Sequence, residues 1–267
     1  PLPLGGFGIS RYKLDSMLAD IAMRAGVQVM QNTKVDNAEF NNELFTIQFN
    51  GKKIKAKITA GAFGKRSNLD IKWNRSFAKK RDNKLNYYIG VKYHIKIDLP
   101  DDLIVLHNFK DGYCGISRIE EGLSCLCYLT TAKNLKESGN SIAAMEENIL
   151  QTNPHLSDIF ATAQRNRTEP VTISQISFDK KEQVNNHVLL LGDAAGMIAP
   201  LCGNGMSMAL LGSKIAFTNI DLKKKKEISR TAMELNYSGA WKKQFGNRLK
   251  VVRMIQALFG KKWITNI

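Results

Sequence analysis

The chain has 267 residues, 43% of them hydrophobic and 24% charged, which is enough to bury the core of one or two domains and excludes global disorder. Lysine and arginine total 39 against 24 acidic residues, and the net charge of +15 favours an anionic partner such as a nucleotide, a nucleic acid or an anionic lipid surface. No apolar run approaches the roughly 18 to 20 residues of a membrane-spanning helix. The four cysteines form no CxxC pair and have no histidine at zinc-ligand spacing, so we expect reduced thiols in a cytoplasmic protein without disulfides or a bound metal.

The first part of the chain predicts a helix, a strand and a hairpin. Ser10 is placed to cap a helix over residues 11–25, because apolar residues recur there at helical spacing and a glycine follows. Residues 27–30 are expected to form a strand. Alternating segments at 44–49 and 54–59 flank an Asn-Gly pair, which is typical of a two-residue hairpin turn.

Four segments of the middle region alternate as β-strands do and predict an antiparallel meander that forms a separate sheet domain. They are residues 87–97, 103–107, 113–119 and 123–129. Helices and short strands are expected after this meander. The helices are predicted at 141–150, 156–163, 204–220 and 229–259, and the strands at 171–176 and 188–191. The last of these helices is strongly basic.

Residues 188–209, which read VLLLGDAAGMIAPLCGNGMSMA, carry the most informative pattern. Asp193 follows an apolar strand and lies in a turn where glycine leaves room for a ligand. Its carboxylate is placed there to accept hydrogen bonds from ligand hydroxyls. A second glycine pair opens a helix, whose N-terminus favours negative charge. Such a site suits a sugar alcohol joined to an electron-rich ring.

At these residues the sequence resembles the flavoprotein superfamily that contains the p-hydroxybenzoate hydroxylase-like enzymes and the geranylgeranyl reductases. The resemblance implies FAD as cofactor, with Gly192 and Asp193 at the ribityl hydroxyls. It also implies that a second segment lies at the edge of the isoalloxazine ring. That segment consists of Pro200, Gly203, Asn204, Gly205 and Met206.

Two more segments agree with the resemblance in the expected order. The helix after Ser10 is similar to the superfamily's Arg-x-x-Phe-Asp-x-x-Leu helix, which implies that Arg11 lies near the cofactor. Val35 occupies the position whose backbone usually faces the adenine. Both positions are also compatible with ordinary packing.

Residues 60–67, which read AGAFGKRS, look like the second fingerprint of these flavoproteins, usually Gly-Ala-Asp-Gly-x-x-Ser. Phe63 replaces the aspartate, which weakens the case for docking of NAD(P)H at this loop. Lys65 and Arg66 are candidates to meet a phosphate, although exposed loop cations are usually only solvated.

One difference within the flavin motif distinguishes two branches of the superfamily. Hydroxylases commonly carry histidine where this chain has Gly196, and the geranylgeranyl reductase-like branch often carries glycine. Cys202 lies in the same segment and is a weak candidate for a catalytic thiol, with a small apolar filler as the alternative. Cys125 and Cys127 share one face of a strand and are expected in the core.

The glycine-rich GxGxxG turn that binds the pyrophosphate in such flavoproteins is absent from this sequence. We therefore expect a segment of roughly 90 residues upstream, about the size of a small domain unit. The expected fold class is α/β, with an incomplete FAD/NAD(P)-binding, Rossmann-like domain interleaved with an antiparallel-sheet substrate domain and followed by C-terminal helices. The expected boundaries are 9–84 and 181–222 for the FAD-binding domain, 85–180 for the substrate domain and 223–267 for the helices.

The leading functional interpretation is an FAD-dependent oxidoreductase that reduces carbon-carbon double bonds of an isoprenoid or other apolar substrate, with NAD(P)H as electron donor. Flavin-dependent aromatic hydroxylation is the alternative reaction. A basic nucleic-acid-binding protein is the alternative from another class, although no nucleic-acid-binding motif supports it. Cations interleaved with aromatic residues from Asp221 to Ile267 suit peripheral contact with a membrane, against the alternative of a solvated basic helix face.

Overall fold

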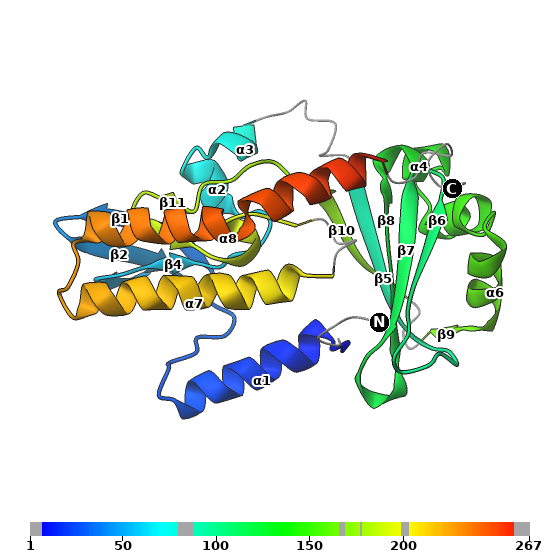
Figure 1. The fold of residues 1–267 in the computed structure, drawn as a ribbon, viewed down its shortest axis with the longest axis horizontal. Helices are drawn as coiled ribbons and strands as arrows, with labels where there is room; N and C mark the ends of the chain where they lie inside the picture. Colours follow the sequence, from blue (N-terminus) through cyan, green and yellow to red (C-terminus); the bar gives the residue numbers. More distant parts are fainter. Residues whose placement is uncertain (1–6, 80–87, 166–168, 177, 199–202, 259–267) are drawn as a thin grey trace. The chain divides into compact units, whose positions relative to one another are not determined.

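The computed structural model describes residues 7–79, 88–165, 169–176, 178–198 and 203–258. The chain divides into two compact units. Unit 1 comprises Pro1–Gln31, Tyr87–Ile176 and Leu258–Ile267, and unit 2 comprises Asn32–Asn86 and Ser177–Ala257. The sequence of unit 2 is therefore interrupted by the sheet of unit 1. Figure 1 labels the helices and strands of both units.

Unit 1 is built on an antiparallel sheet. Its strands are β5 (Tyr88–Lys96), β6 (Ile104–Phe109), β7 (Gly112–Arg118), β8 (Ser124–Thr131), β9 (Gln164–Arg165) and β10 (Val171–Ile176). The order is β10-β5-β8-β7-β6, and β9 pairs with the end of β5. The expected meander is confirmed for β6, β7 and β8, whereas β5 lies beside β8 instead of beside its neighbour in sequence.

Helices pack against one face of this sheet and close the core of unit 1 (Figure 1). They are α4 (Ala132–Glu137), α5 (Ile142–Met145), the π-helical turn η3 (Glu146–Leu150) and α6 (Pro154–Thr162). The buried carboxylate of Glu146 accepts hydrogen bonds from the hydroxyls of Tyr93 (2.7 Å) and Tyr128 (2.8 Å). Helix α6 begins two residues before the predicted start, because Asn153 caps it and Pro154 suits its first turn.

The other face of the sheet remains partly open. Strand alternation places Leu126 and Tyr128 in the core and turns Cys125 and Cys127 to the opposite face, where both thiols are only half-buried. The two cysteines share one face of the strand, as expected, and burial raises the pKa of both thiols, but they lie outside the core cluster of unit 1. Leu106 and Ile173 are exposed on the same open face. Leu106 pairs with Gly115 and Ile173 pairs with Gly90, and residues that pair across two strands point to the same face of the sheet.

Helix α1 (Arg11–Arg24) confirms the first predicted helix. Ser10 caps it by accepting a hydrogen bond from the amide of Lys13, and the amide of Ser10 donates to Glu120 in the short turn η2 (Glu120–Gly122). None of the residues of α1, all of which are described, is buried. Residues 27–30 are exposed and have no regular secondary structure, and the predicted strand does not form because no described strand pairs with them through backbone hydrogen bonds.

Unit 2 contains a three-stranded antiparallel sheet of β1 (Val35–Asn41), β2 (Leu44–Phe49) and β3 (Lys52–Ala56). The predicted hairpin between β2 and β3 is confirmed. Asn50 (φ 46°) and Gly51 (φ 73°) form its turn, because both adopt the left-handed conformation that a two-residue turn of this type needs. Strand β1 has the polar sequence VDNAEFN, which did not stand out as a strand.

A second small sheet in unit 2 has the order β11-β12-β4. Its strands are β4 (Ala60–Gly61), β11 (Val184–Asn185) and β12 (Val188–Leu190). Strands β12 and β4 run parallel, with Leu189 opposite Ala60 and Leu190 opposite Gly61. The segments that follow both strands therefore leave the same edge of this sheet.

The helices of unit 2 are α2 (Asn68–Lys72), α3 (Ser76–Lys79), the short turn η4 (Gly192–Ala194), α7 (Gly205–Lys224) and α8 (Arg230–Leu258). Helix α8 buries an apolar stripe in which every fourth residue is large. The stripe consists of Met233, Tyr237, Trp241, Phe245 and Leu249. Helix α8 lies alongside α7, where its Trp241 packs near Gly212 (Figure 1).

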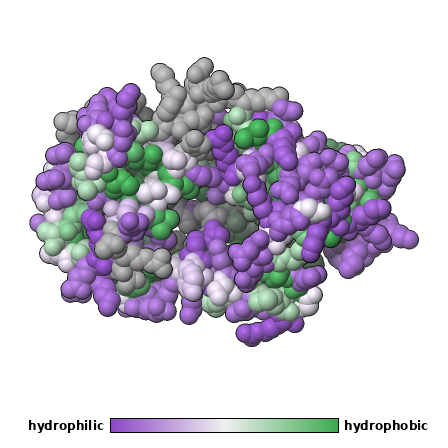
Figure 2. Space-filling view, turned by 180° about the vertical axis from the view of Figure 1, so that it is seen from behind, coloured by the Kyte–Doolittle hydropathy of each residue, from purple (hydrophilic) through white to green (hydrophobic). Residues whose placement is uncertain are grey.

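The surface of the protein is largely hydrophilic, with apolar residues between the polar ones, on the face that Figure 2 shows. Within the described residues, no helix is both long enough and apolar enough to cross a membrane.

Candidate functional site

Strand β12 positions the turn in which the sequence placed the ribityl ligand. Its residues Val188, Leu189 and Leu190 are fully buried, because the short strand is covered on both faces. Gly192 follows with φ +56°, a conformation that L side chains rarely adopt, and the chain then folds into η4. Asp193 is half-buried at the start of this tight turn.

The loop after β4 lies beside this turn. Burial, and after it the neighbouring Arg66, lower the pKa of Lys65, while the carboxylate of Asp193 acts in the opposite direction. Lys65 and Asp193 therefore lie within electrostatic reach of each other, although they are far apart in sequence. The parallel pairing of β4 with β12 brings the two fingerprint segments together.

Helix α7 begins next to the same turn. Gly203 (φ +61°) and Asn204 lead into Gly205, the first residue of this 20-residue helix. Asn204 makes no side-chain capping hydrogen bond to the residues that the structure describes. In the described part of the chain, a Cβ atom at Gly205 would meet nothing within 4 Å. No described residue therefore covers Gly205 at the start of the helix, and the N-terminal end of a helix favours an anion or a polar ligand group.

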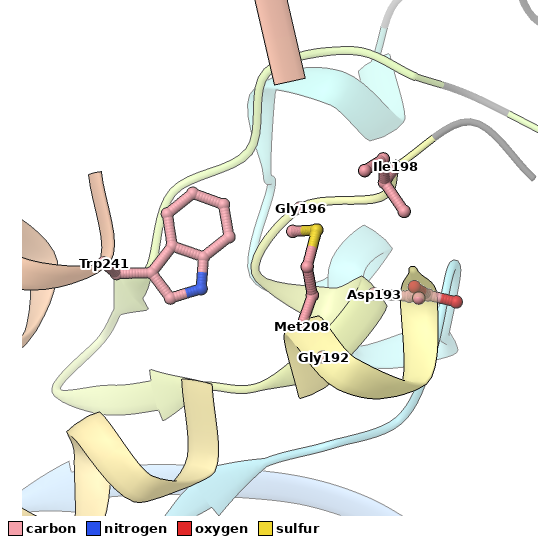
Figure 3. Close-up of a pocket in the computed structure, with 7 residues that line it drawn as sticks. Gly192, Asp193, Gly196, Ile198, Met208 and Trp241 are labelled. Carbon is pink, nitrogen blue, oxygen red and sulfur yellow. The ribbon is translucent and has the colours of Figure 1, made fainter. Parts of the chain in front are cut away.

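These elements meet in a tight crevice, which has no interior space large enough for a water molecule. It is lined by Gly192, Asp193, Gly196, Ile198, Gly205, Met208 and Trp241. Figure 3 shows the indole of Trp241, which comes from α8, on one side of the crevice and Asp193 on the other. The indole packs on Gly196, which also lines the crevice.

The residues assigned to the cofactor from sequence are in different places in the structure. Gly192, Asp193 and Gly205 line the crevice, and Gly203, Asn204 and Met206 adjoin it in sequence at the start of α7. Pro200 and Cys202 lie outside the described residues.

The other two assigned residues stand apart from this group in sequence. Val35 begins β1 in unit 2 and is partly exposed. Arg11 belongs to unit 1, where its guanidinium pairs with Asp15 one helical turn away at 2.9 Å.

Phe63, which stands where the superfamily usually has aspartate, has a packing role. Its ring lies edge-on to Trp73, with 5.9 Å between the ring centroids. A Cβ atom at Gly61 would lie 2.7 Å from the Phe63 ring, so the phenyl group covers the glycine of β4. An aromatic residue at this position is thus explained by local packing.

Three residues that sequence reasoning missed bind the turn from inside unit 2. Arg75, Lys181 and Gln183 are buried, and each donates a hydrogen bond to a backbone carbonyl of the turn. No motif spacing connects these residues with Asp193, and a single lysine or arginine in a sequence reads as a surface cation.

Comparison with known families and proteins is consistent with this geometry. The family model described as squalene epoxidase matches residues 116–246. A curated relative, conditioned medium factor receptor 1 of Dictyostelium discoideum, is 26% identical over 274 residues, which cover 94% of this chain and 50% of that protein. The chain thus spans about half the length of this relative.

Several solved flavoenzymes share the fold. The flavin-dependent brominase Bmp2 is 18% identical, with a TM-score of 0.76, over 93% of this chain and 64% of that chain. The flavin-dependent halogenase CmlS is 18% identical, with a TM-score of 0.71, over 88% of this chain and 44% of that chain. Klebsiella pneumoniae HpxO, solved with FAD and uric acid, is 16% identical, with a TM-score of 0.70, over 95% of this chain and 64% of that chain. The chain therefore has the fold of FAD-dependent oxidoreductases, and the predicted fold class is confirmed.

Proposed function

We propose that the chain forms the flavin-contacting and substrate-binding part of an FAD-dependent oxidoreductase that acts on an apolar substrate. The observation that carries this proposal is the joining of the Gly192–Asp193 turn and the N-terminal end of α7 in one crevice. The similarity to the squalene epoxidase model and to flavin-dependent halogenases supports the same cofactor.

The residues of the crevice fit FAD by their chemistry. Asp193 offers a half-buried carboxylate, which is a suitable acceptor for the ribityl hydroxyls. No described atom covers Gly205 at the start of α7, where backbone amides and the helix dipole stabilise negative charge. When bound there, FAD supplies the electron transfer, and this chain's residues bind and orient it.

The open face of the sheet in unit 1 supports the proposed substrate class. Ile104, Leu106 and Ile173 are exposed on this face, and Cys125 and Cys127 lie half-buried along its centre. Exposed aliphatic side chains that share one face favour an apolar ligand, because contact with it removes them from water. We propose that this face receives the substrate.

For the reaction, we place monooxygenation first. The squalene epoxidase model and the flavin-dependent halogenases of similar fold favour a reaction that uses oxygen. Reduction of a carbon-carbon double bond, which the sequence favoured, remains the second candidate. The prediction of reduction rested on Gly196 and Phe63. Both residues pack against neighbouring aromatic side chains, and this packing is compatible with either reaction. In either reaction a nicotinamide cofactor is the proposed electron donor.

Cofactor binding is tested by titrating FAD into the full-length protein that contains this chain. Asp193→Ala should weaken binding about tenfold to a hundredfold, because the ribityl hydroxyls lose their charged acceptor. Asp102→Ala is the matched control, since Asp102 is exposed in a loop outside the crevice. Equal affinity of Asp193→Ala and wild type would reject the assignment.

The two candidate reactions are separated by isotope labelling. Turnover under ¹⁸O₂ places one labelled atom in the product of a monooxygenase and the other in water, with two electrons taken from the nicotinamide donor. A reductase adds two hydrogens to the double bond, and its product carries no label. An unlabelled, hydrogenated product would replace monooxygenation with reduction.

A further inference from the structure

Three successive backbone carbonyls of the Asp193 turn each accept a hydrogen bond from a different buried side chain. Lys181 Nζ donates to the carbonyl of Asp193 at 2.7 Å, and Arg75 Nη2 donates to that of Ala194 at 2.9 Å. Gln183 Nε2 donates to the carbonyl of Ala195 at 3.0 Å. We call Arg75, Lys181 and Gln183 the carbonyl clamp.

The residues of the clamp are themselves held in place. Arg75 Nη1 pairs with the buried carboxylate of Asp70 at 2.7 Å, and its Nη2 also donates to the carbonyl of Glu182 at 3.1 Å. Gln183 Nε2 also donates to the carbonyl of Lys181 at 2.7 Å. The donors are therefore fixed before any ligand binds, which is the condition for a preorganised site.

Lys181 connects the turn with the second fingerprint loop. Its ammonium donates at 2.7 Å to the carbonyl of Lys65 as well as to that of Asp193. Its Nζ also lies 4.4 Å from the centre of the Phe77 ring, over which the guanidinium of Arg75 stacks at 4.8 Å. A lysine that is 6% exposed thus links two loops that lie more than 100 residues apart in sequence.

The amides of the turn are also used within the protein. Those of Ala195 and Gly196 donate to the carbonyl of Gly192, and that of Ala194 donates to the carbonyl of Leu191. Asp193 lines the crevice, so its side chain is the group of this turn that is placed to meet a ligand. Its direction then depends on how firmly the backbone is held.

We propose that the carbonyl clamp consists of positioning residues for FAD, and that Lys181 fixes Asp193 relative to the Lys65 loop so that both segments meet the cofactor together. This inference rests on the proposed FAD-binding function and deepens it. A clamp built only for stability would act equally on the protein with and without cofactor.

The charge of Lys181 provides a readout of this role. Burial, and after it the charge of Arg75, lower the pKa of Lys181 to about 8, while Asp70, Asp193 and Asp179 oppose the shift. An ammonium makes stronger hydrogen bonds to carbonyls than a neutral amine does. The affinity for FAD should therefore fall as pH rises from 7 to 9.

The experiment measures FAD dissociation constants of the full-length protein at pH 7, 8 and 9. Lys181→Met keeps the aliphatic stem and removes the donors, and we expect its affinity at pH 7 to be about tenfold or more below that of wild type. We also expect the decline in affinity between pH 7 and 9 to be smaller in this variant than in wild type. Lys180→Met, which changes the exposed lysine next in sequence, is the matched control and should behave as wild type.

Each outcome decides the proposal. If wild type binds FAD and Lys181→Met binds it equally with the same pH profile, the positioning role is rejected. If wild type binds no FAD, the proposed function itself fails. Should Lys181→Met not fold, Gln183→Leu removes one neutral donor, and unchanged FAD affinity in that folded variant would overturn the clamp.

Discussion

The indole of Trp241 packs so closely on Gly196 that its Cη2 atom lies 2.6 Å from the position a Cβ atom would take there. Two glycines, Gly196 and Gly212, border this ring, and the second leaves 3.6 Å to the indole nitrogen. Glycine at 196 therefore follows from the presence of tryptophan at 241. The residue cannot by itself distinguish a reductase from a hydroxylase.

Gly196→Ala should lower the free energy of unfolding by about 1 to 3 kcal/mol, because the buried indole must shift to admit the methyl group. Urea unfolding followed by circular dichroism measures the change. Gly239→Ala is the matched control, since a Cβ there meets no described atom within 4 Å and alanine favours the helix. In the Trp241→Phe background, Gly196→Ala should lower the free energy of unfolding by less than it does in the wild-type background. An equal loss in both backgrounds would show that the indole does not obstruct the added methyl group.

Lys181 should make the free energy of unfolding rise with pH between about 8 and 10.5. Its pKa is about 8 in the folded protein against an ordinary value of 10.5, so in this window the unfolded chain binds the proton that the folded chain has lost. Stability measured without FAD should therefore increase by about 1 to 3 kcal/mol more in wild type than in Lys181→Met on going from pH 7 to pH 10. A pH-independent difference between the two proteins would contradict this prediction.

The Glu146 cluster should dominate the stability of unit 1. Removing its carboxylate leaves the buried hydroxyls of Tyr93 and Tyr128 without their acceptor and the guanidinium of Arg165 without the partner it has at 3.1 Å. Glu146→Ala should cost about 3 to 5 kcal/mol, and Glu146→Gln less, because the amide oxygen still accepts hydrogen bonds. Equal costs of the two variants in denaturant unfolding would contradict this, because they would show that the lost charge alone, and not the hydrogen bonds, accounts for the destabilisation.

Binding to anionic vesicles, predicted from the basic tail, should be electrostatic only. Five large apolar residues of α8 are buried, from Met233 to Leu249 at every fourth position, and Leu235 is the exposed exception in that range, whereas Lys242, Lys243 and Lys250 are exposed. The protein should therefore sediment with anionic vesicles at low salt. It should stay in the supernatant at about 1 M salt, where charges are screened beyond about 3 Å. Binding to neutral vesicles, or binding that resists salt, would contradict this expectation.

Local signals in the sequence were enough to predict the elements that carry the crevice. The apolar strand, the Gly-Asp turn and the glycine start of α7 lie within one stretch of 22 residues from Val188 to Ala209. These elements follow one another directly in the sequence, so a local pattern was enough to predict them. The Asn50-Gly51 hairpin was equally clear, because the turn chemistry is local.

The clamp was beyond reach of such reasoning, because it depends on contacts between residues far apart in sequence. Arg75 and Lys181 are separated by 181 − 75 = 106 positions, and nothing near either residue indicates burial. The predicted strand at residues 27–30 was wrong for a related reason. Their valines favour a strand, but a strand also needs a neighbour, which a pattern within four residues does not reveal.

The interrupted sequence of unit 2 sets the order in which the protein folds as the ribosome makes it. The sheet of unit 1 is encoded by one continuous stretch from Tyr88 to Ile176, so it is complete before β12 has been synthesised. Strand β4 must meanwhile wait for a partner 189 − 60 = 129 residues downstream, and non-local pairing of this kind is slow. The crevice at Asp193 is thus among the last features of the chain to form. Until β12 has been synthesised, β4 has an unpaired edge, so the first segment of unit 2 needs protection from aggregation during synthesis.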